Sequence, residues 1–249
     1  MQTVRSLLFF LTLACGLFLF IAPIAAEIEL QLRDNLKRAQ PGDYLVTAQN
    51  KNYTILLIRS KDTDYLGIEE ITVPSTRVNT KACSWRRWIE SGAQGSTSWV
   101  LYHIYLPTGT IQQTFSFTRN EWVNIPQSQN FLSTLLNLNL TKIPDSERKR
   151  VGPPPSSDSP DKRLTWQPPL ISDGQTITGV TFDGWRTRWP KDSSELSGRL
   201  IEVYLPTNSD KYPAYFPYWL QVTGIVGKAK VRIVDSGSRI TSPARLPPH

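Results

Sequence analysis

The stretch Trp99-Val-Leu-Tyr-His-Ile-Tyr-Leu-Pro-Thr-Gly-Thr-Ile-Gln-Gln-Thr-Phe-Ser-Phe-Thr118 decides the fold class. Two runs that are rich in β-branched and aromatic residues, 99–106 and 110–118, flank the short sequence Pro107-Thr108-Gly109. Such runs, joined by a short loop that contains glycine, are typical of an antiparallel β-hairpin. We therefore expect a mostly β protein.

Further strands are expected on both sides of this hairpin. Short runs rich in Val, Ile, Leu, Thr and Tyr favour strands, and they occur at 43–48, 53–59, 65–73, 176–182, 200–205, 218–225 and 229–234. One or two short helices are also expected. Leu32 and Leu36 have helical spacing within 27–39, and 131–136 is rich in leucine, with Ser128 as a candidate N-cap.

A proline-rich stretch, residues 150–162, divides the chain. Such sequence favours an extended linker because it offers almost nothing to a core. We therefore predict an N-terminal β unit at 27–149 and a C-terminal β unit at 163–249. Both are expected to be small, antiparallel and sandwich-like. The end of the second unit, from Ser242, is expected to be a mobile tail.

Similar motifs recur in the same order in the two units. Trp85-Arg-Arg-Trp88, His103-Ile-Tyr-Leu-Pro-Thr108 and Trp122 occur in the first, and Trp185-Arg-Thr-Arg-Trp189, Glu202-Val-Tyr-Leu-Pro-Thr207 and Trp219 in the second. Ordered recurrence with small changes of length is what a duplicated unit shows. We predict a duplication, with chance recurrence of aromatic strand motifs as the alternative.

The first 26 residues have the pattern of a cleavable signal peptide. Arg5 precedes an apolar run from 7 to 24, and Ala25-Ala26 follows before the polar Glu27. Export and cleavage require such a basic start, apolar centre and small-residue end. We predict an exported protein that is periplasmic, outer-membrane-associated or secreted. An uncleaved membrane anchor is the alternative.

The positive charge of the chain favours anionic partners. The formal net charge is +7 for the whole chain, and it falls to +6 when the leader with Arg5 is removed. We expect an envelope protein or an anionic glycan as the partner, with peripheral membrane association as a further option. Export argues against nucleic acid. Cys83 is then the only cysteine, so no intramolecular disulfide can form, and a buried free thiol is expected.

The usual catalytic signatures are missing from the sequence. The only histidines are His103, within a predicted strand, and His249, the last residue. There is no pattern for a catalytic triad, a zinc site or a phosphate loop, so we expect no metal and no cofactor. Paired carboxylates could still hydrolyse a glycosidic bond. The candidates are Glu69, Glu70, Asp183, Glu195 and Glu202.

Aromatic residues offer a better candidate site. Trp185-Arg186-Thr187-Arg188-Trp189 alternates indoles with guanidinium groups, and residues 212–219 combine several aromatic rings with two prolines. Arginine over an indole makes a flat, partly polar platform on which sugar rings stack. We predict a recognition surface built from Trp185, Arg186, Arg188, Trp189, Tyr215, Tyr218 and Trp219. The alternative is that these rings belong to the core.

Three stretches carry a family resemblance: 189–206, 215–221 and 227–237. In these stretches, about a seventh of the chain, the sequence resembles uncharacterised exported envelope proteins of chlamydia-type bacteria. The resemblance implies a Gram-negative envelope and brings no site residues with it. The sequence thus predicts an exported, non-catalytic envelope protein that binds a protein partner or an envelope glycan. The alternative is a carbohydrate-active enzyme that works through paired carboxylates.

Overall fold

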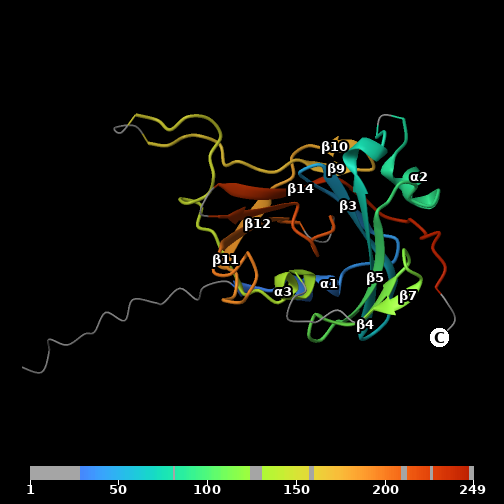
Figure 1. The fold of residues 1–249 in the computed structure, drawn as a ribbon. Helices are drawn as coiled ribbons and strands as arrows, with labels where there is room; N and C mark the ends of the chain where they lie inside the picture. Colours follow the sequence, from blue (N-terminus) through green and yellow to red (C-terminus); the bar gives the residue numbers. More distant parts are fainter. Residues whose placement is uncertain are drawn as a thin grey trace, which may run out of the picture.

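A computed structural model describes residues 29–80, 82–123, 131–156, 160–208, 212–224 and 227–246. The predicted leader and the candidate cap Ser128 lie outside these ranges. The described part is mostly β, as the central hairpin predicts (Figure 1).

One antiparallel sheet of 12 strands dominates the described residues, in the order β1-β8-β11-β12-β13-β14-β2-β3-β4-β5-β6-β7. A separate hairpin pairs β9 with β10. The first seven strands are β1 (Glu29–Leu30), β2 (Tyr44–Gln49), β3 (Asn52–Lys61), β4 (Tyr65–Pro74), β5 (Ser98–Tyr105), β6 (Thr110–Ser116) and β7 (Glu121–Val123). The others are β8 (Leu140–Lys142), β9 (Leu170–Ser172), β10 (Gln175–Ile177), β11 (Phe182–Arg188), β12 (Leu200–Pro206), β13 (Trp219–Thr223) and β14 (Lys228–Gly237).

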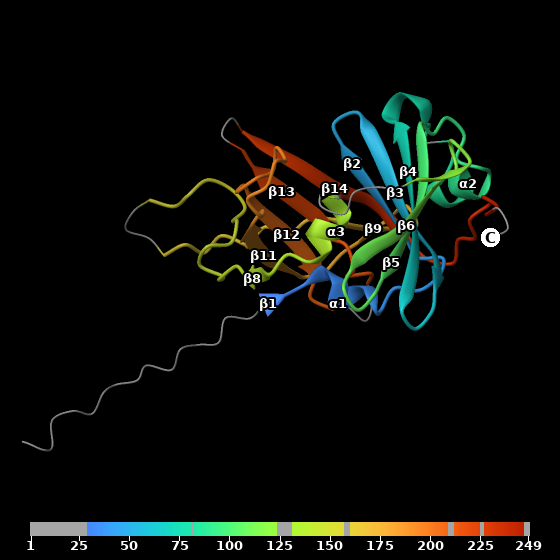
Figure 2. The same cartoon turned by 60° about the horizontal axis from the view of Figure 1, so that its bottom comes forward.

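Three short α-helices accompany the sheet: α1 (Leu32–Leu36), α2 (Trp85–Glu90) and α3 (Phe131–Leu136). A 3₁₀ turn, Ser75–Arg77, follows β4. Helices α1 and α3 lie between the two halves of the sheet, whereas α2 lies beyond β3 and β4 (Figures 1 and 2). We call the sheet face toward α1 and α3 the inner face, and the opposite one the outer face.

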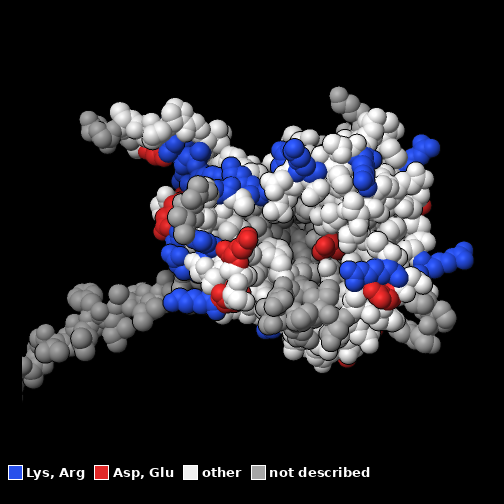
Figure 3. All heavy atoms as spheres, in the orientation of Figure 1, with Lys and Arg blue, Asp and Glu red and all other residues white. Residues whose placement is uncertain are grey.

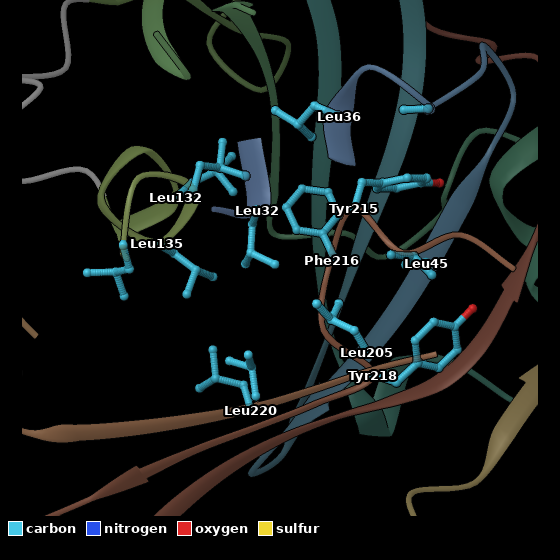
Figure 4. Close-up of a cluster of buried hydrophobic side chains, with 14 of the residues drawn as sticks. Leu32, Leu36, Leu45, Leu132, Leu135, Leu205, Tyr215, Phe216, Tyr218 and Leu220 are labelled. Carbon is cyan, nitrogen blue, oxygen red and sulfur yellow. The ribbon is translucent and has the colours of Figure 1, made fainter. Parts of the chain in front are cut away.

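The larger core lies on the inner face. Leu32 and Leu36 of α1 and Leu132 and Leu135 of α3 pack against strands from both halves of the sheet. Figure 4 shows these leucines beside Tyr215, Phe216, Tyr218 and the strand residues Leu45, Leu205 and Leu220. Because α1 and α3 come from the first predicted unit and most of these strand and loop residues from the second, the two units share one hydrophobic core.

The smaller core lies on the outer face of β2–β4, under α2. Ser84 begins this helix, and its hydroxyl accepts a hydrogen bond from the amide of Arg87, as an N-cap does. Trp85 and Trp88, three residues apart, therefore point to the same side of the helix. They are 7 % exposed each and pack on Ile55, Ile71 and other outer-face residues of the strands.

The proline-rich stretch 150–162 is exposed at 151–156 and 160–162, but it does not span from one unit to another. The amide of Val151 donates to the carbonyl of Leu164, and the amide of Trp166 donates to the carbonyl of Lys149. These bonds hold the two ends of the stretch side by side. The stretch is therefore an excursion that leaves the body and returns to the same place, as Figure 2 shows.

The predicted duplication does not match the topology. Trp85 and Trp88 lie on a helix, whereas Trp185 lies on a strand and Trp189 follows it. In the first unit β6 separates β5 from the strand of Trp122, whereas in the second β12 pairs directly with β13, the strand of Trp219. The recurring motifs thus occupy unlike positions, because the same residue types suit a helix that buries one side and a strand that buries one face.

The C-terminal segment is fixed to the sheet through Ala244, contrary to the expectation of a tail that is mobile from Ser242. The Arg59 guanidinium donates to the Ala244 carbonyl at 2.9 Å, and the Ser242 hydroxyl donates to Glu69 at 2.8 Å. Glu69 is fully buried and also pairs with Arg59. A buried carboxylate needs such partners, and the segment after β14 supplies one of them.

Most expected strands are found within a few residues of their predicted positions, but the run 176–182 is divided. Its first residues belong to β10, and β11 begins only at Phe182, after a turn in which Gly179 has a φ of +76°. Cys83 has a free thiol and is half-buried rather than buried. Among the described residues no helix is both long and apolar enough to cross a membrane.

Candidate functional site: a basic, aromatic face of the sheet

The seven residues of the predicted recognition surface come from β11 and the residue after it, from the segment that leads into β13, and from the first residue of β13. The structure does not bring them together on one surface. Four of them are buried, with exposed fractions of 8 %, 4 %, 2 % and 1 % for Trp185, Trp189, Tyr215 and Tyr218. These four rings belong to the larger core, so that part of the prediction is wrong.

The burial of these rings follows from their partners. Trp185 points to the inner face of β11, and the ring of Trp189 stacks on Phe131 of α3 with centroids 5.4 Å apart. Residues 212–218 form a loop, as their prolines require, and this loop folds over the sheet toward α1. The aromatic-rich segments 185–189 and 212–218 therefore lie where α1 and α3 cover the core.

Arg186 and Arg188 lie on the outer face of β11, and both have partners. Arg186 forms an ion pair with Glu147, and Arg188 donates to the carbonyl of Gly198 at 3.2 Å. Arg186 therefore has a counter-charge, whereas the partner of Arg188 is a neutral carbonyl, and both contribute positive charge to this side of the sheet.

Trp219, the seventh predicted residue, lies at the centre of a cluster on the outer face. Its ring is half-buried and lies edge-to-face with Trp166, with centroids 5.0 Å apart. The Lys149 ammonium lies 4.9 Å from the centroid of Trp166 and 5.6 Å from that of Trp219. Lys230 lies 5.7 Å from the centroid of Trp219. Cations at such distances are attracted by the negative faces of the rings.

Strand register explains how these residues meet. Trp219 pairs with Arg232, Gln221 with Lys230, and Thr223 with Lys228, so these side chains share one face. Lys149 and Trp166 reach the same face because the exposed excursion leaves and returns there. We call Lys149, Trp166, Trp219, Lys228 and Lys230 the basic-aromatic patch.

Positive charge dominates the patch. Among the described residues, no carboxylate forms an ion pair with Lys149, Lys228, Lys230 or Arg232. Partial burial lowers the pKa of Lys149, and the charges of Lys230 and Lys228 lower this pKa further. Lys and Arg side chains gather at the end of the molecule where β11, β12 and β14 lie (Figures 1 and 3).

Two polar atoms beneath the lysines also lack partners. The Trp219 indole Nε1 and the Gln221 side-chain oxygen are buried, and neither has a hydrogen-bond partner in the described part of the chain. The Gln221 amide nitrogen donates to Glu202 at 3.3 Å, and the charge of this carboxylate acts against the lowering of the Lys149 pKa. Unneutralised cations beside aromatic rings and an unused donor suit an anionic ligand with a flat face.

The sequence alone pointed to Trp219 and not to the other four residues of the patch. Lys149 directly precedes the stretch for which the sequence predicts a linker, and Trp166 belongs to none of the recurring motifs. The signal that was available is the alternation Lys228-Ala-Lys230-Val-Arg232 in β14, which places three cations on one face of a strand.

The five candidate carboxylates do not form a facing pair. Glu69 and Glu70 point to opposite faces of β4, and Glu69 is paired with Arg59. Asp183 pairs with Lys142 at 3.0 Å, and Glu202 accepts from Gln221. Glu195 lines an open hollow of about 670 Å³ at the β13–β14 turn.

A carboxylate pair that the sequence patterns did not indicate lies where β14 meets the β9–β10 turn. The Tyr44 hydroxyl lies 3.3 Å from Asp173 and 3.1 Å from Asp235, and Arg86 of α2 pairs with Asp173 at 2.9 Å. Burial raises the pKa of Asp235, and the nearby Asp173 raises it further. Since these groups join α2, β14 and the small hairpin, their evident role is to fasten three elements together.

A family model described as CT021 protein matches residues 54–178. The chain belongs to the CT021 protein family. The match runs from within β3 to just beyond β10 and includes Lys149 and Trp166 of the patch. No curated protein matches the chain.

A solved structure of a CT021 protein has a fold similar to that of this chain. The chain is similar to the 2.0 Å structure of the hypothetical protein CT021 from Chlamydia trachomatis, with 20 % sequence identity and a TM-score of 0.63. The alignment covers 89 % of this chain and 99 % of that one. The predicted resemblance to uncharacterised chlamydial proteins is thereby confirmed. At this identity, the likeness shows a shared fold.

Proposed function

We propose that this member of the CT021 family is an exported, non-catalytic protein of the cell envelope that binds an anionic glycan through the basic-aromatic patch. The observation that carries the proposal is the position of Lys149 and Lys230 over two indole rings, with Lys228 on the same face of β14. Among the described residues, no carboxylate forms an ion pair with these lysines. The export part rests on the pattern of residues 1–26.

The chemistry of the patch favours an acidic sugar over a simple anion. The carbon–hydrogen face of a pyranose ring packs on an indole such as Trp219, while ammonium groups at the rim pair with carboxylate or sulfate substituents. In the free protein, repulsion from Lys230 and Lys228 lowers the pKa of Lys149. A bound anion offsets this repulsion. A ligand that combines flat rings with regular negative charge satisfies both requirements.

Calorimetry with an oligogalacturonate, a chain of uronic acids, tests this proposal on protein purified from an exporting host. We expect saturable binding that weakens steeply as salt rises, because the contacts are between ions. The double variant Lys149→Gln/Lys230→Gln should bind about tenfold more weakly, which corresponds to roughly 1.4 kcal/mol. The control Lys37→Gln/Lys61→Gln removes the same charge just after α1 and at the end of β3, and it should bind as the wild type does.

Two outcomes would contradict the proposal. Equal losses for the two double variants would mean that only net charge matters. Release of shorter sugars during the titration would instead favour the alternative, a carbohydrate-active enzyme, and Asp235→Asn would then test the carboxylate pair at Tyr44.

A further inference from the structure

A groove lies on the outer face of β3–β6, in the half of the sheet that does not contain the basic-aromatic patch. It has a volume of about 460 Å³ and is lined by side chains of β3–β6, among them Tyr65, His103, Gln112 and Gln113, with Gly67 on its floor. Asp62, before β4, is its acidic group, and the described residues of the lining include no lysine or arginine. Its chemistry therefore differs from that of the basic-aromatic patch.

The strand register creates the groove. Ser60, Gly67, His103 and Gln113 are cross-strand partners in a row over β3, β4, β5 and β6. Gly67 has no side chain, and an added Cβ would lie 2.5 Å from the Ser60 hydroxyl. Gly67 therefore adds no side chain to the row, and the Ser60 hydroxyl lies close to the position that its Cβ would take.

A bulge in β6 brings two amides to the groove. The pairing of β5 with β6 shifts by one residue between His103 and Ile104. As a result, Gln112 and Gln113 are both exposed and both line the groove, although consecutive strand residues ordinarily point to opposite faces. Each amide offers a donor and an acceptor, the combination that two neighbouring hydroxyls of a sugar can satisfy.

One exposed aromatic ring lines the groove, and a second contacts the lining residue His103. Tyr65 is 45 % exposed and is held by Tyr105, with ring centroids 5.3 Å apart. Trp122 of β7 is 41 % exposed, and its ring lies edge-to-face with His103 at 6.0 Å and with Phe115 at 5.2 Å. Each ring thus presents exposed surface while its neighbours fix its orientation, which lowers the entropic cost of binding.

From this arrangement we infer that the groove beside Tyr65, with the neighbouring ring of Trp122, is a binding site for an uncharged glycan chain. The exposed rings of Tyr65 and Trp122 pack against the apolar faces of hexopyranose units. Gln112, Gln113 and the floor beside Gly67 receive their hydroxyl groups. The absence of lysine and arginine from the described lining separates this ligand class from the acidic sugar proposed for the basic-aromatic patch.

The test uses the full exported protein and a panel of neutral hexaoses: cellohexaose, maltohexaose and chitohexaose. Calorimetry and NMR are recorded in low and high salt. We expect at least one hexaose to bind with little change between the two salt concentrations, and to shift the Trp122 indole and the side-chain amide signals of Gln112 and Gln113. Trp122→Ala and Gln113→Ala should each weaken binding by about tenfold.

Phe131→Ala is the matched control, because Phe131 is 44 % exposed and lies on α3, away from the groove. It should leave hexaose binding unchanged. If no hexaose binds, or if the signals that shift lie elsewhere, the inference is overturned. Because the wild-type spectra decide between these outcomes, a variant that fails to fold does not change the result. The result of this test does not depend on the test of the basic-aromatic patch, since Lys149→Gln/Lys230→Gln should bind the hexaose as the wild type does.

Discussion

Two regions of the outer face, the basic-aromatic patch and the groove beside Tyr65, both contain aromatic rings, but the charges around the rings differ. At β13–β14, Trp166 and Trp219 lie beside Lys149 and Lys230. At β4–β7, exposed rings lie beside neutral amides and an imidazole. The antiparallel backbone is the same in both places. The difference teaches that the charge of a surface depends on which residues line the outer face of single strands, lysine in β14 and glutamine in β6.

The largest expected effect separates these surface rings from the buried ones. Trp185→Ala removes a ring that is 8 % exposed and should lower the free energy of unfolding by about 3–5 kcal/mol, the usual cost of emptying an aromatic core position. Trp122→Ala removes a ring that is 41 % exposed and should cost clearly less. Urea unfolding followed by circular dichroism measures both, and equal losses would show that Trp122 also supports the core.

Two neighbouring carboxylates of β4 provide a sharper comparison of the outer and inner faces. Glu69→Gln breaks a buried ion pair with Arg59 and should cost about 3–5 kcal/mol, because the arginine loses its partner. Glu70 faces the inner side, and burial raises its pKa above 4.5. Glu70→Gln should therefore have the opposite sign and stabilise the protein at pH 7.

The pH dependence follows from the direction of that shift. A raised pKa means that the folded protein binds the proton of Glu70 more tightly than the unfolded chain does. Its contribution to stability is thus present at low pH and is lost as the pH rises from 4.5 through the folded pKa. In Glu70→Gln, the decline of the melting temperature over this range should be smaller than in the wild type. An identical pH profile would mean that Glu70 is well solvated.

The smallest expected effect concerns the ionisation of the patch. Burial lowers the pKa of Lys149, and Lys230 is the next largest cause. Lys230→Gln should raise this pKa part of the way toward 10.5, and bound oligogalacturonate should raise it too. NMR titration of the lysine side chains follows the change. A Lys149 pKa that is the same in wild type and variant would mean that the two ammonium groups do not interact, which would weaken the contrast between the two surfaces.

Much of the fold could be predicted from local sequence. The hairpin at 99–118, the strands of β2–β4 and the leucine-rich helix α3 are found where their patterns place them, because each pattern is a property of adjacent residues. The site could be predicted only in part. Trp219 was identified, but Lys149 and Trp166 join it through hydrogen bonds between residues that flank an exposed excursion, and no local pattern encodes that return.

The sequence by itself determined the class of the fold, the positions of most strands and the alternation that puts cations on one face of β14. The tertiary structure decided what covers each face. Trp185 and Tyr218 are buried because α1, α3 and a proline-containing loop close over the inner face. Tyr65 and Trp122 stay exposed because α2 and the C-terminal segment cover other parts of the outer face, and no described element covers the part where these two rings lie. Strand alternation fixes the face to which a side chain points, but whether that face meets water depends on residues far away in the chain.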